Sequence, residues 1–197
     1  EKTIRLREMT AWLSSCTTAD AALRTTLDEA AAIAKADLVS QVVIEFPSLQ
    51  GTMGGVYATV GGFPEAVARA VAEHYLPLSA TAPVPSTLSG GLLAVADKAD
   101  NIIGAWVAGE KPSGSRDPYG LRRAAMGIVR ISLQYTLRFS LRALVDAACM
   151  AYERQYKGLV GEDGAQEMFA FVRERLEALL LEEGVPYDVV AAAFGSS

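Results

Sequence analysis

The sequence has few of the side chains that enzymes use for metal binding and nucleophilic catalysis. Its 197 residues include one histidine, His74, and two cysteines, Cys16 and Cys149, which lie far apart in the chain. A catalytic triad needs a histidine beside its nucleophile, and a zinc site needs several correctly spaced ligands. The sequence therefore argues against both kinds of site. The two cysteines are typical of unpaired thiols in a reducing compartment.

Three other sequence signals are missing. No apolar run approaches the roughly 18 residues that cross a membrane, and no charged and then apolar leader opens the sequence. The stretch KPSGS at 111–115 lacks the glycine and lysine order of a P-loop, so we expect no ATP there. The sequence opens on Glu1 rather than methionine and stops inside a predicted helix. We interpret it as a piece of a longer protein.

The composition is that of a folded helical protein. Apolar residues make up 51% of the chain and charged residues 21%. Many of the apolar residues are alanine, a strong helix former, and no stretch alternates β-branched and polar residues as strands do. We therefore predict an all-α fold.

Periodicity, capping residues and Pro/Gly breaks place the predicted helices. Ile4, Met9 and Leu13 form the apolar stripe of the first helix, and the cluster at 17–20 caps the second. The predicted helices span residues 3–15, about 20–45, 65–76, 90–107, 121–156 (as one helix or two), 167–183, and a last one from 187. Glycines make 50–63 a loop or a broken helix. We place a domain boundary in the loop at 110–118, giving domains at 1–112 and 113–197.

Four ionisable residues lie on or beside faces that should point inward: Asp37, His74, Asp97 and Asp100. Buried carboxylates need hydrogen bonds, counter-charges or a cation. A histidine and several aspartates on successive helices resemble the HD superfamily of metal-dependent phosphohydrolases, in which such residues hold a metal that activates water.

The HD pattern is incomplete in this sequence. Ala36 precedes Asp37 where that superfamily has a histidine, and the upstream histidine is missing as well. One imidazole with scattered carboxylates would hold a transition metal weakly. We predict no resident metal and no catalytic residue. Two interpretations stay open: a hydrogen-bonded relic that fixes helix packing, or a weak Mg²⁺ or Mn²⁺ site.

Positive charge is concentrated between Glu110 and Arg142. That segment carries seven cations and two acids, a net charge of +5, while the whole chain is −5 and the rest therefore −10. Arginines beside a Gly-Ser loop suit phosphate contacts. The acidic total argues against general DNA coating, and the cations could instead pair with acidic residues at a domain interface. The seven cations are Lys111, Arg116, Arg122, Arg123, Arg130, Arg138 and Arg142.

An ordered set of short strings resembles the β subunit of bacterial heterotetrameric glycyl-tRNA synthetase. The likeness covers about residues 2–140, with a weaker continuation at 173–192. The strings are Lys35–Leu38, Glu45–Phe46, Leu49–Gly51, Met53–Gly54, Tyr57–Ala58, Glu73–Pro77, Ala96–Lys98, Asp100, Pro112, Gly114–Ser115, Asp117–Pro118, Leu121–Ala125, Gly127 and Arg130–Ile131.

The resemblance implies an HD-like helical bundle followed by the start of a second helical domain. It implies a cytoplasmic ligase that charges glycine tRNA using ATP and Mg²⁺ in a separate α subunit, with no cofactor, DNA or membrane bound by this piece. We expect Lys111, Arg116, Arg122 and Arg123 to contact the tRNA backbone. The alternatives are an HD-type phosphohydrolase and a purely structural docking domain.

Overall fold

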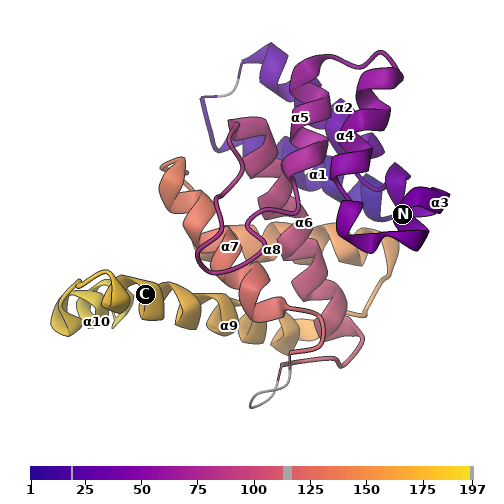
Figure 1. Cartoon of the computed structure of the whole chain (residues 1–197). Coiled ribbons are helices and arrows are strands. Elements are labelled where there is room, and N and C mark those ends of the chain that lie inside the picture. The colour runs from indigo at the N-terminus through magenta and orange to yellow at the C-terminus, as the bar shows by residue number, and fades with distance from the viewer. Residues whose placement is uncertain (19, 113–116, 196–197) are drawn as a thin grey trace.

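The computed structural model describes residues 1–18, 20–112 and 117–195, and in these residues the chain forms helices and no strand (Figure 1). The all-α prediction is confirmed. No helix in this described part is long and apolar enough to cross a membrane. The elements are α1 (Lys2–Ser15), α2 (Ala21–Ile33), the 3₁₀ helix η1 (Ala36–Val39), α3 (Gln41–Glu45), the 3₁₀ helix η2 (Pro47–Leu49), α4 (Thr52–Val60), α5 (Glu65–Glu73), α6 (Leu88–Val107), α7 (Leu121–Gln134), α8 (Leu141–Gln155), α9 (Gly161–Glu182) and α10 (Tyr187–Gly195).

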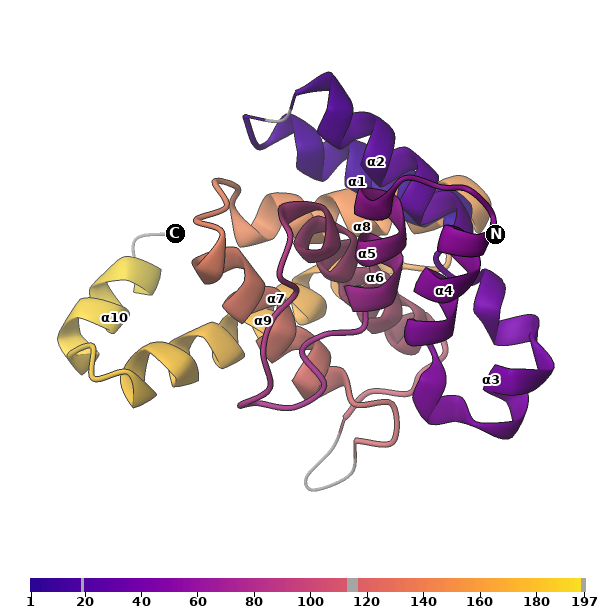
Figure 2. The same ribbon diagram turned by 45° about the horizontal axis from the view of Figure 1, so that its top comes forward.

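Helix α6 is the central element. It contacts α1, α2, α5, α7, α8 and α9, which surround it (Figures 1 and 2). Most of its residues are buried, including charged ones, so its sequence is apolar on nearly every side. Thr87 begins the helix by accepting a hydrogen bond from the backbone N–H of Gly90 at 3.1 Å.

One apolar core runs through the chain from Leu6 in α1 to Val172 in α9. This core includes residues on both sides of the domain boundary that we predict between residues 112 and 113. The boundary itself stays a prediction. The inward stripe of α1 is Leu6, Met9 and Leu13. Ile4 does not belong to it, because its side chain is 52% exposed while the neighbouring Arg5 turns inward. Helix α10 packs on α9.

The predicted helix at 20–45 is wrong beyond Ile33. Asp20 caps α2 as expected, accepting from the N–H of Leu23 at 2.8 Å, but the chain then turns through η1. Ser40 caps the separate helix α3, accepting from the N–H of Val43 at 3.3 Å. Such local side-chain caps compete with helix continuation. The turn directs Asp37 inward, where it accepts from the N–H of Gly51 at 2.7 Å.

Other boundaries differ less. The segment 121–156 forms two helices, with Ser140 capping α8 by accepting from the N–H of Ala143 at 3.0 Å. Helix α9 begins at Gly161, six residues before the predicted start. Helix α5 ends at Glu73 rather than residue 76.

Helix α4 forms where glycines suggested a loop or a broken helix. The glycines let α4 approach α5 closely: a Cβ on Gly55 would lie 2.8 Å from the Cβ of Ala72 and 2.9 Å from the carbonyl oxygen of Ala68. Helix contact thus outweighs the poor helix propensity of glycine, about 1 kcal/mol per residue.

Replacing Gly55 with alanine should therefore destabilise the protein, although alanine favours helices. Because one of the two close atoms belongs to the α5 backbone, the helices must separate, and overpacking of this kind costs about 1–3 kcal/mol. Urea denaturation measures the change. Gly62→Ala is not a neutral control, because its φ of 79° disfavours alanine. Ala66→Gly, at an exposed position of α5, measures the difference in helix propensity between alanine and glycine without a packing effect. An unchanged or higher stability for Gly55→Ala would contradict the close-packing explanation.

Candidate functional site

The four predicted inward residues come together in a buried charge cluster. Asp37, His74, Asp97 and Asp100 are 0–2% exposed, so their predicted burial is confirmed. Four cations join them that the sequence analysis did not assign to the cluster. Two come from α1, one precedes η1 and one lies on α6: Lys2, Arg5, Lys35 and Lys98.

Asp97 is the anion that joins two of these cations. Its Oδ1 atom lies 2.9 Å from Nζ of Lys2 and 3.0 Å from Nζ of Lys35. These are ion pairs rather than well-directed hydrogen bonds, because Oδ1 has no hydrogen-bond partner of good geometry among the described residues. Burial opposes the charged carboxylate, but Lys2 and Lys35 overcome it and hold the pKa of Asp97 well below its usual value.

Asp100 connects α6 to the first helix. Arg5 donates from Nε to Oδ1 of Asp100 at 2.5 Å and from a terminal nitrogen to Oδ2 at 3.1 Å. Lys2 donates to the same Oδ2 at 2.9 Å. The guanidinium group of Arg5 also lies over the ring of Tyr152 in α8, 4.1 Å from its centroid. A planar, two-point pair of this type fixes orientation as well as charge.

His74 is neutral and held at both ring nitrogens. Its Nδ1 atom lies 2.6 Å from the carbonyl oxygen of Val71, and its Nε2 atom lies 2.7 Å from Nζ of Lys35. The ammonium can only donate, so Nε2 accepts and Nδ1–H donates. Burial, aided by the charge of Lys35, lowers the pKa of His74 to about 3. Burial likewise lowers the pKa of Lys35 to about 8, against the attraction of Asp97.

The cluster does not fit a divalent cation. The ammonium of Lys35 lies between Nε2 of His74 and Oδ1 of Asp97, the two atoms best suited to share a metal. The described part of the chain has no group of three or more His, Cys, Asp or Glu residues arranged to hold an ion. Lysine thus supplies the positive charge that an HD-type metal would bring.

Lys98 explains where α5 ends. Its Nζ donates to the carbonyl oxygens of Leu76 at 2.6 Å, Tyr75 at 3.2 Å and His74 at 3.4 Å. Those carbonyls lie at the C-terminal end of α5, where helices leave acceptors without partners and favour a positive charge. The cluster therefore ties α1, η1, α5 and α6 together.

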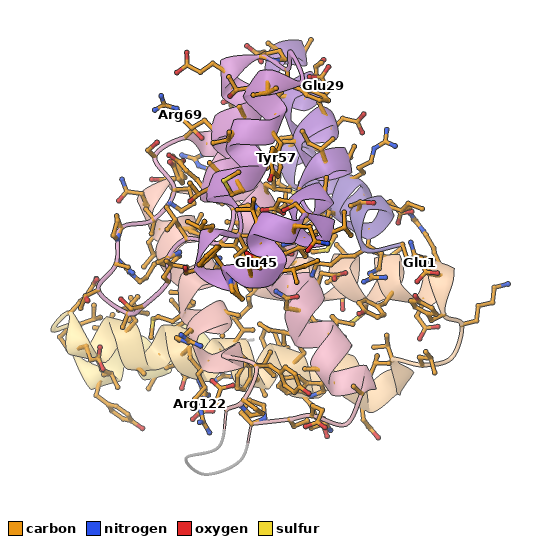
Figure 3. All side chains as sticks on the ribbon, turned by 45° about the vertical axis from the view of Figure 1, so that its right-hand side comes forward. Glu1, Glu29, Glu45, Tyr57, Arg69 and Arg122 are labelled. Atoms are coloured by element: carbon orange, nitrogen blue, oxygen red, sulfur yellow. The ribbon has the colours of Figure 1, made fainter. Side chains whose placement is uncertain are left out.

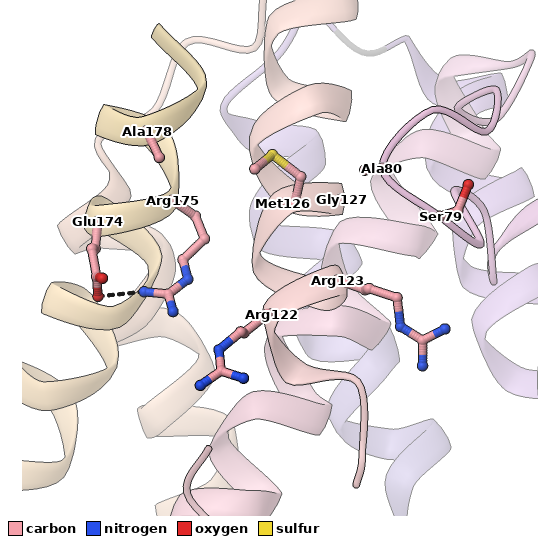
Figure 4. A pocket seen from close by; sticks show the side chains of 9 residues that line it. All are labelled: Ser79, Ala80, Arg122, Arg123, Met126, Gly127, Glu174, Arg175 and Ala178. Atoms are coloured by element: carbon pink, nitrogen blue, oxygen red, sulfur yellow. Dashed lines mark hydrogen bonds and ion pairs between the residues drawn. The ribbon is translucent and has the colours of Figure 1, made fainter. Parts of the chain in front are cut away.

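A second candidate site is a pocket of about 410 Å³ between α7 and α9. Arg122 and Arg123 come from the first turn of α7, and Arg175 comes from α9. Figure 4 shows the side chains of Arg122 and Arg175 on the side of α7 that faces α9, and the side chain of Arg123 pointing the other way, towards the side of Ser79. Arg122 lies at the end of the molecule opposite Glu29 and Arg69 (Figure 3).

The rest of the basic segment is mostly paired within the chain. Lys111 forms an ion pair with Glu167 of α9, and Arg142 pairs with Asp146 at 2.9 Å. Arg130 donates to the carbonyl oxygen of Ala82 at 2.8 Å. Arg116 lies outside the described residues. Of the four predicted tRNA contacts, Arg122 and Arg123 line one pocket, and Lys111 pairs with α9.

Comparison with known proteins identifies the family. A model of the glycyl-tRNA synthetase beta subunit family matches residues 1–195. The chain belongs to this family. It is 44% identical over 194 residues to the glycine–tRNA ligase beta subunit of Oleidesulfovibrio alaskensis, covering 98% of this chain and 27% of that protein. The beta subunits of Nitratidesulfovibrio vulgaris and Shouchella clausii are 43% and 41% identical over 197 residues, each covering 100% of this chain and 28% of the relative. The chain thus spans about a quarter of the length of these relatives.

Sequence reasoning missed Arg175 and the cations of the charge cluster. Lys35 and Lys98 stand in the strings that carry the family resemblance, two residues before Asp37 and one after Asp97. That proximity to inward aspartates was a usable signal. Arg175 lies more than 50 residues from Arg122, and only the packing of α9 on α7 brings them together.

Proposed function

We propose that this chain is a tRNA-contacting and scaffolding part of a glycine–tRNA ligase β subunit, without catalytic residues of its own. The relatives carry the name of that subunit. The observation that carries the tRNA contact is the set of three guanidinium groups lining one pocket, Arg122, Arg123 and Arg175. Guanidinium groups are the side chains best suited to paired contacts with phosphate.

The wider assignment follows from the family. We propose a cytoplasmic enzyme in which an α subunit binds ATP and Mg²⁺ and activates glycine, while the β subunit contacts glycine tRNA. In this chain the charge cluster would hold the helices together instead of binding a cofactor, because Lys35 takes the place of a cation beside His74 and Asp97. Because the Lys35 ammonium lies where an HD-type metal would bind, we do not favour an HD-type phosphohydrolase.

A purely structural docking domain is the second candidate. The internal pairs of Lys111 and Arg142 favour it, since part of the basic segment is already neutralised by this chain. The two functions differ in one prediction: only a tRNA surface loses salt-dependent binding when Arg122 and Arg123 are changed.

Reversing both charges, as Arg122→Glu/Arg123→Glu, should weaken tRNA binding at least tenfold at low salt. Each phosphate contact releases about one counterion, so the slope of log K against log salt should fall by about two. Fluorescence anisotropy over a salt series measures both quantities, on this chain and on a full-length β subunit that carries it. Wild-type affinity and slope in both proteins would contradict the tRNA surface and favour docking.

The matched control is Arg24→Glu/Arg69→Glu. It makes the same change in net charge at exposed positions of α2 and α5, away from the pocket (Figure 3 labels Arg69). An equal loss in this control would mean that net charge, rather than the α7–α9 surface, determines binding.

A further inference from the structure

The α7–α9 pocket combines positive charge with an apolar floor. Arg123 and Arg175 bring guanidinium groups, while Met126, Gly127 and Ala178 supply apolar surface between them. A surface that contacts only the phosphate backbone requires positive charges but no pocket. At about 410 Å³ the pocket falls in the range of small-ligand sites, about 300–1,000 Å³.

Arg175 is held in position before any ligand arrives. Its guanidinium group lies over the ring of Phe171, 4.4 Å from the centroid, and forms an ion pair with Glu174. Its side chain is only 16% exposed. A guanidinium plane fixed in this way, on the wall of a pocket, presents a flat cationic surface of the kind on which bases stack.

The wall formed by the loop after α5 is also fixed. Arg130 donates to the carbonyl oxygens of Ala82 at 2.8 Å and Ser79 at 3.4 Å, which ties the loop to α7. Ser79 and Ala80 of this loop line the pocket opposite α9 (Figure 4). The recess is thus built from three segments that other contacts hold together.

We infer that this pocket takes one unpaired nucleotide of an RNA, with its phosphate against Arg122 and its base between Met126 and the guanidinium plane of Arg175. The inference rests on the proposed tRNA contact and specifies it. Base stacking on flat side chains strengthens binding and requires a base free of its partner strand. The carboxylate of Glu174 adds an acceptor for an exocyclic amino group.

The test places a carboxylate in the pocket without disturbing the core. Ala178 is an exposed residue of α9 that lines the pocket, and glutamate is a good helix former. Ala178→Glu should weaken binding of a single-stranded RNA hexamer at least tenfold and of a blunt RNA duplex less than twofold. Ala170→Glu, also exposed on α9 but outside the pocket, should change neither. Anisotropy titrations on the full chain measure both, and circular dichroism checks folding.

Each other outcome decides against the inference. Equal weakening of hexamer and duplex would mean a backbone surface only, which overturns the nucleotide pocket and leaves the tRNA contact standing. The pocket is also overturned if the chain does not bind the hexamer, or if Ala178→Glu binds it normally. Competition by a free nucleoside monophosphate without preference for single-stranded RNA would assign the pocket to a free nucleotide. The proposed tRNA contact has a separate test: it fails if Arg122→Glu/Arg123→Glu leaves the affinity for tRNA unchanged.

Discussion

Replacing Asp97 with alanine is expected to lower the free energy of unfolding by about 3–5 kcal/mol, the usual effect of removing one partner from a buried ion pair. The carboxylate is 1% exposed and lies within 3.0 Å of both Lys2 and Lys35. Without it, the Lys35 ammonium loses its ion pair and keeps its contacts with the neutral ring of His74 and the face of Tyr75. Urea denaturation at pH 7 measures the loss.

The control for this prediction is a surface ion pair of similar geometry. Arg7 donates to both carboxylate oxygens of Asp28, at 2.7 and 2.8 Å, but both side chains are at least half exposed. Exposed pairs contribute little, so Asp28→Ala should change stability much less than Asp97→Ala. Equal effects would mean that burial of the Asp97 pairs does not matter.

A second variant separates charge from shape. If the loss comes from an uncompensated buried ammonium, then Asp97→Leu/Lys35→Met should be more stable than Asp97→Leu alone, since apolar replacements of a buried pair are often tolerated. If the double variant is instead less stable than the single one, Lys35 stabilises the fold through contacts other than the one with Asp97.

The buried aspartates could be predicted from the sequence, but their partners could not. Asp100 lies on the apolar stripe of one long helix and Asp97 lies beside it, so helical periodicity alone directs them inward. Arg5 pairs with Asp100 across 95 positions, and nothing in the pattern of the first helix places Arg5 rather than Ile4 inside. That choice depends on how α1 packs on α6, which is a tertiary property.

The helix boundaries also differ in whether local sequence or tertiary packing sets them. Capping by Asp20 is local, and the start of α2 was predicted correctly. The helix at Gly54 and Gly55 was not, because propensity favours a break and only the close approach of α5 overrides it. The arginine pocket could be predicted in part. Arg122 and Arg123 could be selected from local charge, whereas Arg175 joins the pocket only through the packing of α9.

The stability of the chain should fall by about 2 kcal/mol between pH 7.5 and pH 5, because of His74 alone. In the unfolded chain this histidine binds a proton at its ordinary pKa of about 6.5. In the folded chain burial and the neighbouring Lys35 lower its pKa to about 3, so the ring stays neutral throughout this range. The unfolded state therefore binds more protons as the pH falls, and unfolding is favoured.

A single histidine makes this prediction easy to check, since no other imidazole titrates in the chain. Urea denaturation at a series of pH values should show the decline in the wild type and a much smaller one in His74→Gln, whatever the stability of that variant at pH 7.5. The lowered pKa of Asp97 acts only at more acidic pH, because an unfolded aspartate protonates near pH 4. The imidazole resonance in NMR spectra should stay constant over the same range. A titration of that resonance with a midpoint near pH 6.5 would show that His74 is not held neutral between Lys35 and Val71.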